Sequence, residues 1–237
     1  MIVWRPDVRW AARVAVAALV ACAPGIARAQ SAPVLRPWRP VFELAAGWNG
    51  ANNLGRVDAT IRGPLVGAAT APGFRLFTTE SELGVAPAAL VGVVLPVSRH
   101  WAVAVRARAA RPTLTTRILD DAEGAPAVEA TEAIADYTVD LSVLYHLPRL
   151  GGRRARPYLV AGGGYLRQLH EDNALVETGR TWHGGGGVRW WLRGGDQATR
   201  AVGLTGDLRW VWRSGGIAFT DGARAMPAAA LGLFVGF

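Results

Sequence analysis

The chain has 237 residues, enough for one sizeable domain or two small ones. Only 19% of the residues are charged, below the roughly 25% of ordinary soluble domains, whereas glycine (29 residues) and tryptophan (10 residues) are abundant. The formal net charge is +8, but the sequence has no cluster of cationic and aromatic residues of the kind that binds nucleic acid. Nucleic acid is therefore not expected among its partners.

The first 29 residues predict a secretory signal peptide. A cationic leader precedes the apolar run VAVAALVA, which is too short for a transmembrane helix. Ala27 and Ala29 then fit a cleavage site, and a short Pro-rich lead, 30–40, follows. The segment LVAC also fits a bacterial lipobox, with Cys22 as the lipidated residue. We favour cleavage after Ala29, which leaves no cysteine for a disulfide or a thiolate metal site.

From residue 41 onward, apolar and polar residues alternate with the period of two that marks half-buried β-strands. The clearest alternation runs from Ala135 to Leu147. The segment 89–97 is apolar on both faces, and the phase of 156–169 is not secure. Eight strands are predicted in all, at 41–48, 89–97, 101–109, 135–147, 156–169, 181–192, 201–213 and 229–237.

The links between these strands alternate in length. A long link, 49–82, separates the first two strands, although 74–79 is itself strand-like. The tripeptide SRH alone joins the second strand to the third, and longer and shorter links continue to alternate, with a weak contrast around the fifth and sixth strands. Transmembrane β-barrels combine short periplasmic turns with longer outer loops. The sequence therefore predicts an all-β fold, a single eight-stranded antiparallel up-and-down transmembrane β-barrel over residues 41–237.

Aromatic residues fall near the two ends of the predicted strands. In membrane barrels such rings settle at the two membrane–water interfaces. The alternative, an ordinary soluble core, would not sort its rings into two bands. We therefore predict two interface girdles, one at the short-turn end (Trp101, Tyr145, Tyr158 and Trp190, with Phe237) and one at the long-loop end (Trp48, Tyr137, Trp182, Trp210 and Trp212).

The polar faces of the strands carry the charged residues, so the orientation of these faces decides what the barrel encloses. We predict apolar faces toward lipid and charged faces inward, because a soluble barrel would crowd the tryptophans into one narrow interior. An eight-stranded barrel is just wide enough for its own side chains, and a buried charge without a partner is costly. By position, Arg108 would lie beside Asp140, and Arg189 beside Asp207. The interior is thus predicted to be plugged by ion pairs among Glu43, Arg106, Arg108, Asp136, Asp140, Arg189, Asp207 and Arg209.

The last strand carries apolar residues at alternate positions, Leu231, Leu233 and Val235, and then Phe237. In this pattern the chain resembles the small eight-stranded outer-membrane β-barrels of Gram-negative bacteria, the family of the outer-membrane protein A transmembrane domain and the OmpX-like proteins. The resemblance implies that these residues form an assembly signal read by the barrel-assembly machinery. It also implies a monomer in the cell outer membrane, with outer-membrane lipids and lipopolysaccharide as partners.

No catalytic, cofactor-binding or metal-binding pattern is found. Ser142 and His146 share a strand face, but four residues along a strand separate them by roughly 13 Å, beyond hydrogen-bond reach. The glycine runs AGGGY and HGGGGV lack the helix and lysine of a phosphate-binding loop. The predicted outer loops could hold a divalent cation, against the alternative of solvated charge, at His170–Asp172 or among Asp120, Asp121, Glu123, Glu129 and Glu132.

The sequence thus favours an integral outer-membrane β-barrel protein with a structural and surface-display role and no catalysis. The first alternative is a narrow porin-like channel for small solutes, and the second is a lipid-modifying outer-membrane enzyme. A cationic inner rim would attract anionic phospholipid headgroups. The residues of that rim are Arg99, Arg149, Arg153, Arg154, Arg156, Arg193 and Arg200, against the single acidic residue Asp196.

Overall fold

The computed structural model describes residues 38–61, 73–147, 149–152, 154–171, 175–193, 201–218 and 222–237. The predicted signal peptide, 1–29, and most of the lead, 30–40, lie outside these residues. No helix among the described residues is long and apolar enough to cross a membrane.

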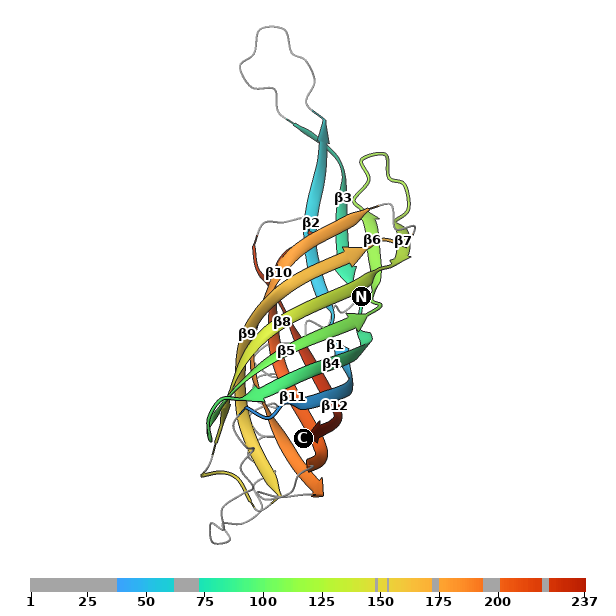
Figure 1. Cartoon of the computed structure of the whole chain (residues 1–237). Helices are drawn as coiled ribbons and strands as arrows, with labels where there is room; N and C mark the ends of the chain where they lie inside the picture. The colour runs from blue at the N-terminus through green and yellow to red at the C-terminus, as the bar shows by residue number, and fades with distance from the viewer. Residues whose placement is uncertain are drawn as a thin grey trace. The chain divides into compact units, whose positions relative to one another are not determined.

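Eight strands close into an antiparallel barrel in the order β1-β12-β11-β10-β9-β8-β5-β4 (Figure 1). Each is paired with its neighbours along the chain, and β12 closes the barrel on β1 with Val235 opposite Phe42. The prediction of an all-β, eight-stranded up-and-down barrel is confirmed, because every predicted strand overlaps one strand of the barrel. The bounds are β1 (Val41–Asn49), β4 (Ala86–Pro96), β5 (Trp101–Ala110), β8 (Ala135–His146), β9 (Ala155–Leu169), β10 (Val176–Arg193), β11 (Ala201–Gly215) and β12 (Arg224–Gly236).

The two long links contain a second antiparallel sheet, which we call the projecting sheet. Its strands, in the order β2-β3-β6-β7, are β2 (Asn52–Ile61), β3 (Phe74–Leu83), β6 (Thr113–Leu119) and β7 (Val128–Ala133). Only a residue or two separates each of them from a barrel strand, as Gly50 and Ala51 do between β1 and β2. One wall of the barrel therefore continues past the rim (Figure 1). We call this end of the barrel the loop end and the opposite end the short-turn end.

Buried and exposed side chains alternate along the barrel strands, because successive side chains of a strand point to opposite faces. In β8, Asp140 and Ser142 are buried, whereas Val139, Leu141 and Val143 are exposed. The other barrel strands alternate in the same way over most of their length, and their buried charged residues include Glu43, Arg106, Arg189 and Asp207. Arg167 and Arg180, nearer the loop end, are exposed. The segment that was apolar on both faces, β4, places Leu90 and Val94 inside.

The glycine runs of β9 and β10 make room for large interior side chains. A Cβ atom at Gly187 would lie 2.6 Å from the hydroxyl oxygen of Tyr158, and one at Gly162 would lie 2.9 Å from Nε2 of His183. Both distances are shorter than any carbon side chain tolerates. These glycines therefore have a packing role in the barrel, in agreement with the absence of a phosphate-binding loop.

Candidate functional site in the barrel interior

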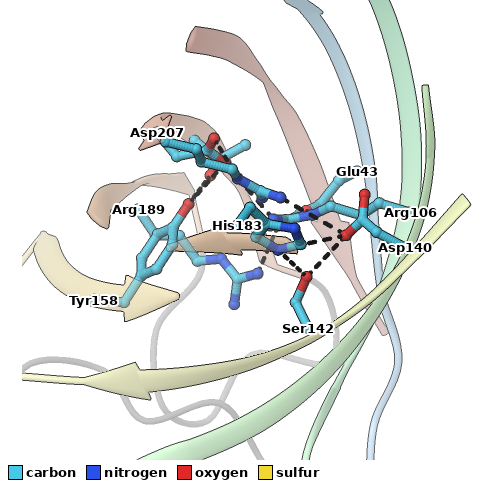
Figure 2. A network of polar contacts seen from close by, with 10 residues as sticks. Glu43, Arg106, Asp140, Ser142, Tyr158, His183, Arg189 and Asp207 are labelled. Atoms are coloured by element: carbon cyan, nitrogen blue, oxygen red, sulfur yellow. Dashed lines mark hydrogen bonds and ion pairs between the residues drawn. The ribbon is translucent and has the colours of Figure 1, made fainter. Parts of the chain in front are cut away.

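A network of charged side chains, which we call the charged layer, lies inside the barrel, and Glu43 of β1 is one of its members (Figure 2). Arg106 of β5 donates from Nε to Glu43 at 2.9 Å, and its Nη2 lies 2.8 Å from the same oxygen. Arg189 of β10 donates to the other carboxylate oxygen at 2.5 Å. The guanidinium of Arg189 also lies 5.7 Å from the ring centre of Tyr158 and 5.8 Å from that of Phe234. One carboxylate thus joins arginines from two separate parts of the wall.

A second carboxylate, Asp207 of β11, extends this layer. Arg209 donates to it from Nε at 2.9 Å and from Nη2 at 3.2 Å. Nη1 of Arg106 lies 3.7 Å away, and the hydroxyl of Tyr158 donates to Asp207 at 3.3 Å. Arg106 therefore links the two carboxylates into one network.

Ser142, His183 and Asp140 form a compact group beside this network (Figure 2). The Ser142 hydroxyl donates to Asp140 at 2.8 Å and lies 3.0 Å from Nε2 of His183. The same Nε2 lies 3.8 Å from Asp140. In a catalytic triad the carboxylate binds the other ring nitrogen of the histidine, and the serine faces the substrate. Here both groups meet one nitrogen, and Ser142 is only 1% exposed, so the geometry does not fit nucleophilic catalysis.

Sequence reasoning missed the contact between Ser142 and His183 because β9 lies between their strands. In the strand register, Gly162 of β9 is opposite Ser142 on one side and opposite His183 on the other. Gly164 is placed in the same way between Asp140 and Thr181. Without side chains at these glycines, residues two strands apart can touch. The glycine run was the signal that could have identified this contact.

The structure places all eight predicted ion-pair residues on the interior side, but two of the specific partners differ. Arg189 binds Glu43 rather than Asp207. Arg108 donates to Asn49 at 2.7 Å and forms no described ion pair with Asp140. The cause is the stagger of the strands, since β5 and β8 pair with Arg106 opposite Asp140. The remaining carboxylate, Asp136, lies 2.6 Å from Nη1 of Arg213, an arginine that the predicted set omitted.

Clusters of buried apolar side chains lie on both sides of the charged layer. At the short-turn end, the residues that we call the short-turn cluster are Val41, Val94, Ala102, Ala104, Leu144, Tyr158, Val160, Trp191 and Phe234. At the loop end, the mouth cluster consists of Leu54, Leu83, Leu114, Ile134 and Ile217. Ile217 follows β11, which lies opposite β5 in the barrel order, so the mouth cluster bridges the opening.

Most of the predicted girdle residues point outward, but Tyr158 does not. At the short-turn end, Trp101 is exposed and stacks on Tyr145 with ring centres 4.8 Å apart. The assignment of Tyr158 to this girdle is wrong, because its side chain is 1% exposed and lies inside the barrel. The same strand carries Gly162, Gly163 and Gly164, which hid the alternation from sequence analysis. The other girdle residues on the outer face are Trp48, Tyr137, Trp182, Trp190, Trp210, Trp212 and Phe237.

Two interior aromatic residues were not predicted. Trp191 and Phe234 are buried in the short-turn cluster, with ring centres 5.6 Å apart. Adjacent strand residues face opposite sides, so the pair Trp190–Trp191 must place one ring inside. On β12, the proposed assembly signal lies on the outer face. Leu231 and Leu233 are exposed there, whereas Val235 is partly buried.

The acidic residues considered as cation ligands lie in the β6–β7 link and in β7. No group of three or more potential ligands that could hold a metal occurs among the described residues. Glu129 pairs with Arg117 at 2.9 Å, and Glu132 accepts a hydrogen bond from His170 at 2.9 Å. The hydrogen bond from His170 lowers the pKa of the Glu132 carboxyl. Asp172 lies outside the described residues.

The structure describes some of the arginines of the predicted inner rim. Arg99, Arg149 and Arg154 are exposed on the short links. Arg156 is buried and donates to the carbonyl of Arg99 at 2.7 Å. Arg153, Arg200, Asp196 and the side chain of Arg193 lie outside the described part of the chain.

No protein-family model matches the sequence, and no curated protein matches it. Among solved structures, the chain is similar to the outer membrane protein OprG from Pseudomonas aeruginosa. The two chains are 10% identical, with a TM-score of 0.49, over 86% of this chain and 98% of that one. The fold assignment does not depend on this likeness, because the closed eight-stranded antiparallel barrel is seen directly.

Proposed function

We propose that the protein is an integral β-barrel of the bacterial outer membrane with a structural and surface-display role. The observation that carries this proposal is the orientation of the two faces of the wall. Leu44, Leu141 and Leu231 are 63%, 58% and 67% exposed, whereas Arg106 and Arg189 are 1% and 0% exposed. A water-soluble barrel would have the opposite arrangement.

The outer face suits hydrocarbon for two reasons. Its exposed apolar side chains extend around all eight strands, and soluble monomers rarely expose contiguous apolar patches of more than a few hundred Å². A closed barrel also pairs every strand with two neighbours, and backbone groups without partners are not tolerated in lipid. The aromatic residues Trp101 and Trp182 lie near opposite ends of this surface, where membrane interfaces attract such rings.

The closed interior supports a structural role over transport. The charged layer is bracketed by the short-turn cluster and the mouth cluster. A solute would have to displace apolar side chains at both ends and break ion pairs in the middle. Such buried pairs are costly to break, because each leaves an uncompensated charge behind.

The two ends of the barrel suggest different partners. The projecting sheet is the part that would be displayed outside the cell beside lipopolysaccharide. Exposed Arg99, Arg149 and Arg154 at the short-turn end would meet anionic phospholipid headgroups. The alternate apolar residues of β12 would be read by the barrel-assembly machinery during insertion, and the inserted protein would be a monomer.

Fractionation of cells that produce the full chain tests the proposal. The protein is expected in the outer-membrane fraction, folded in detergent micelles and migrating as a compact band until it is boiled. When the chain without its leader is placed in buffer without detergent, it is expected to aggregate. A folded, monodisperse protein in plain buffer would contradict the proposed location and role together.

A narrow channel is the second candidate, because the charged layer could conduct ions if the two apolar clusters separated. Planar-bilayer recording of the refolded protein distinguishes the two. The sealed barrel is expected to give no discrete conductance steps. Steps that disappear in heat-denatured samples would favour the channel.

An enzyme is the less favoured candidate, since the Ser142–His183 pair is enclosed and lacks the geometry of a triad. Mass spectrometry of lipid A from cells with and without the protein is expected to give identical spectra. A mass change that required Ser142 would support a lipid-modifying enzyme.

A further inference from the structure

The charged layer contains one more cation than anion. Its described charged members are the arginines Arg106, Arg108, Arg189, Arg209 and Arg213 and the carboxylates Glu43, Asp136, Asp140 and Asp207. Arg156, nearer the short-turn end, binds a carbonyl and is not part of this layer. Five guanidiniums therefore face four carboxylates in a part of the molecule that is shielded from bulk water.

Arg108 is the arginine of this layer that lacks a close carboxylate, and the fourth carboxylate, Asp140, lies 3.7 Å from Nη1 of Arg209. Each of the other four arginines has a carboxylate oxygen within 2.9 Å, namely on Glu43, Asp207 or Asp136. Arg108 has no carboxylate within 4.0 Å among the described residues, and its one described hydrogen bond goes to the amide oxygen of Asn49 at 2.7 Å. A mostly enclosed guanidinium without a counter-charge is unfavourable.

A small cavity lies next to Arg108. Its volume is about 20 Å³, and its lining includes Asn49, Thr181, His183, the arginines Arg108, Arg209 and Arg213, and the carboxylate of Asp140. A cavity of roughly 10–15 Å³ on this measure holds one water molecule. There is thus room for one body of about the size of a water molecule or a halide ion.

The unpartnered groups on the cavity wall are hydrogen-bond donors. Nδ2 of Asn49, Oγ1 of Thr181 and Nε of Arg213 are buried and have no partner among the described residues. The amide and guanidinium nitrogens can only donate, and the hydroxyl can donate. Asn49, Thr181 and Arg213 are 3%, 2% and 4% exposed, so bulk water cannot satisfy these groups. The carboxylate of Asp140 also lines the cavity and accepts a hydrogen bond from Ser142. Three guanidiniums therefore outnumber one carboxylate on the wall, and the unpartnered groups are donors.

We propose that this cavity binds one small monovalent anion, of which chloride is the biological representative. The anion would supply the missing negative charge beside Arg108 and accept hydrogen bonds from Asn49 and Thr181. A cation is disfavoured because three guanidiniums outnumber the single carboxylate, Asp140, on the wall, and a water molecule would satisfy the donors without balancing the charge. The site is independent of the proposed function, because it depends only on the interior.

Chloride-dependent stability tests the site. The protein is refolded into detergent micelles at constant ionic strength, with sodium chloride replacing sodium gluconate, whose anion is too large for the cavity. Above the dissociation constant, each tenfold rise in chloride should multiply the folded-to-unfolded ratio about tenfold, as for any ligand that binds only the folded state. The unfolding midpoint in urea measures this ratio. A midpoint that does not respond to chloride would overturn the proposal.

Arg108→Gln should abolish the chloride response, because it removes the unbalanced charge and keeps a polar side chain. Its midpoint in gluconate should be equal to or higher than that of the wild type. Arg117→Gln is the matched control, since it removes an exposed arginine of the projecting sheet and should keep the full response. If both variants respond to chloride like the wild type, the effect comes from the surface and the site does not exist.

Crystals of the unmodified protein grown in sodium bromide give a direct readout that needs no variant. A bromide anomalous peak is expected in the cavity, beside the Arg108 guanidinium. Electron density at that position without an anomalous signal would show a water molecule instead of an anion and would overturn the proposal.

Discussion

The barrel interior and the projecting sheet contain the same kinds of ion pair in opposite surroundings. Arg106 and Glu43 pair where both side chains are 1% exposed, whereas Arg117 and Glu129 pair at 54% and 51% exposure. Water and salt screen the exposed pair, which contributes little to stability. The enclosed pair has no water to replace a lost partner, so its loss is costly. The comparison indicates that location, rather than the number of pairs, decides what holds this protein together.

Glu43→Gln is expected to have the largest effect on stability, and it tests the contrast between buried and exposed ion pairs most directly. The change leaves Arg189 without a carboxylate and Arg106 with only the longer contact to Asp207 at 3.7 Å. Breaking a buried pair by removing one partner costs about 3–5 kcal/mol. The loss should be measured by urea unfolding in lipid vesicles. The control Glu129→Gln, on the projecting sheet, should change stability by no more than about 1 kcal/mol. Equal effects of the two variants would refute the distinction between the regions.

A second variant separates the outer face of the barrel from that of the projecting sheet. Leu141 lies midway along β8 and is 58% exposed. If this surface contacts the bilayer, Leu141→Arg should destabilise the inserted protein by about 2–4 kcal/mol, as arginine does near the midplane of membrane barrels. Val57, which is 40% exposed on β2, provides the control. Val57→Arg should have almost no effect in the same vesicle assay, and a tolerant Leu141→Arg would argue against a lipid-facing position.

A smaller effect on stability is expected at two tyrosines that lie on opposite faces of the barrel wall. Tyr158→Phe removes the hydroxyl that donates to Asp207 inside the barrel, and should cost about 1 kcal/mol. Tyr137 is 48% exposed on the outer face, so Tyr137→Phe should leave the stability unchanged. Unfolding midpoints of the two variants measured side by side provide the test. The reverse order would mean that the hydroxyl of Tyr158 does not contribute to the interior network.

The smallest effect is a pH dependence confined to the loop end. The hydrogen bond from His170 depresses the pKa of Glu132 in the folded protein. A depressed carboxyl pKa stabilises the fold above the ordinary glutamate pKa of 4.5, and this contribution disappears as the pH falls through the lower folded value. The protection factors of the β7 amides, which compare each exchange rate with the intrinsic rate at the same pH, should therefore fall on acidification from pH 6 to pH 3. Glu132→Gln should remove that change, while the protection factors in β8 stay constant.

Particular residues show which features of the fold could be predicted from the sequence. The alternation of Asp140 and Leu141 was sufficient to identify β8 and to assign its two faces, because a strand has only two faces. The same reasoning failed at Tyr158, because the neighbouring glycines have no side chain and so do not indicate which face of the strand is buried. The reasoning also did not predict that Trp191 is buried, because only its neighbour Trp190 was assigned to a face of the strand. Of the projecting sheet, only part of β3 was noted as strand-like, at 74–79. Strands such as β2 and β7 were missed because they are polar and largely exposed on both faces and so lack a clear period.

By itself the sequence determined the number of barrel strands, their antiparallel succession and, in the strands with a clear alternation, the side that faces inward. These features follow from periodicity and link length, which are local properties of the chain. The tertiary structure alone decided which charges meet. Glu43 and Arg189 are 146 positions apart, and only the closure and stagger of the barrel bring them into contact. The unbalanced charge at Arg108 arises in the same way, since it depends on partners that no local pattern specifies.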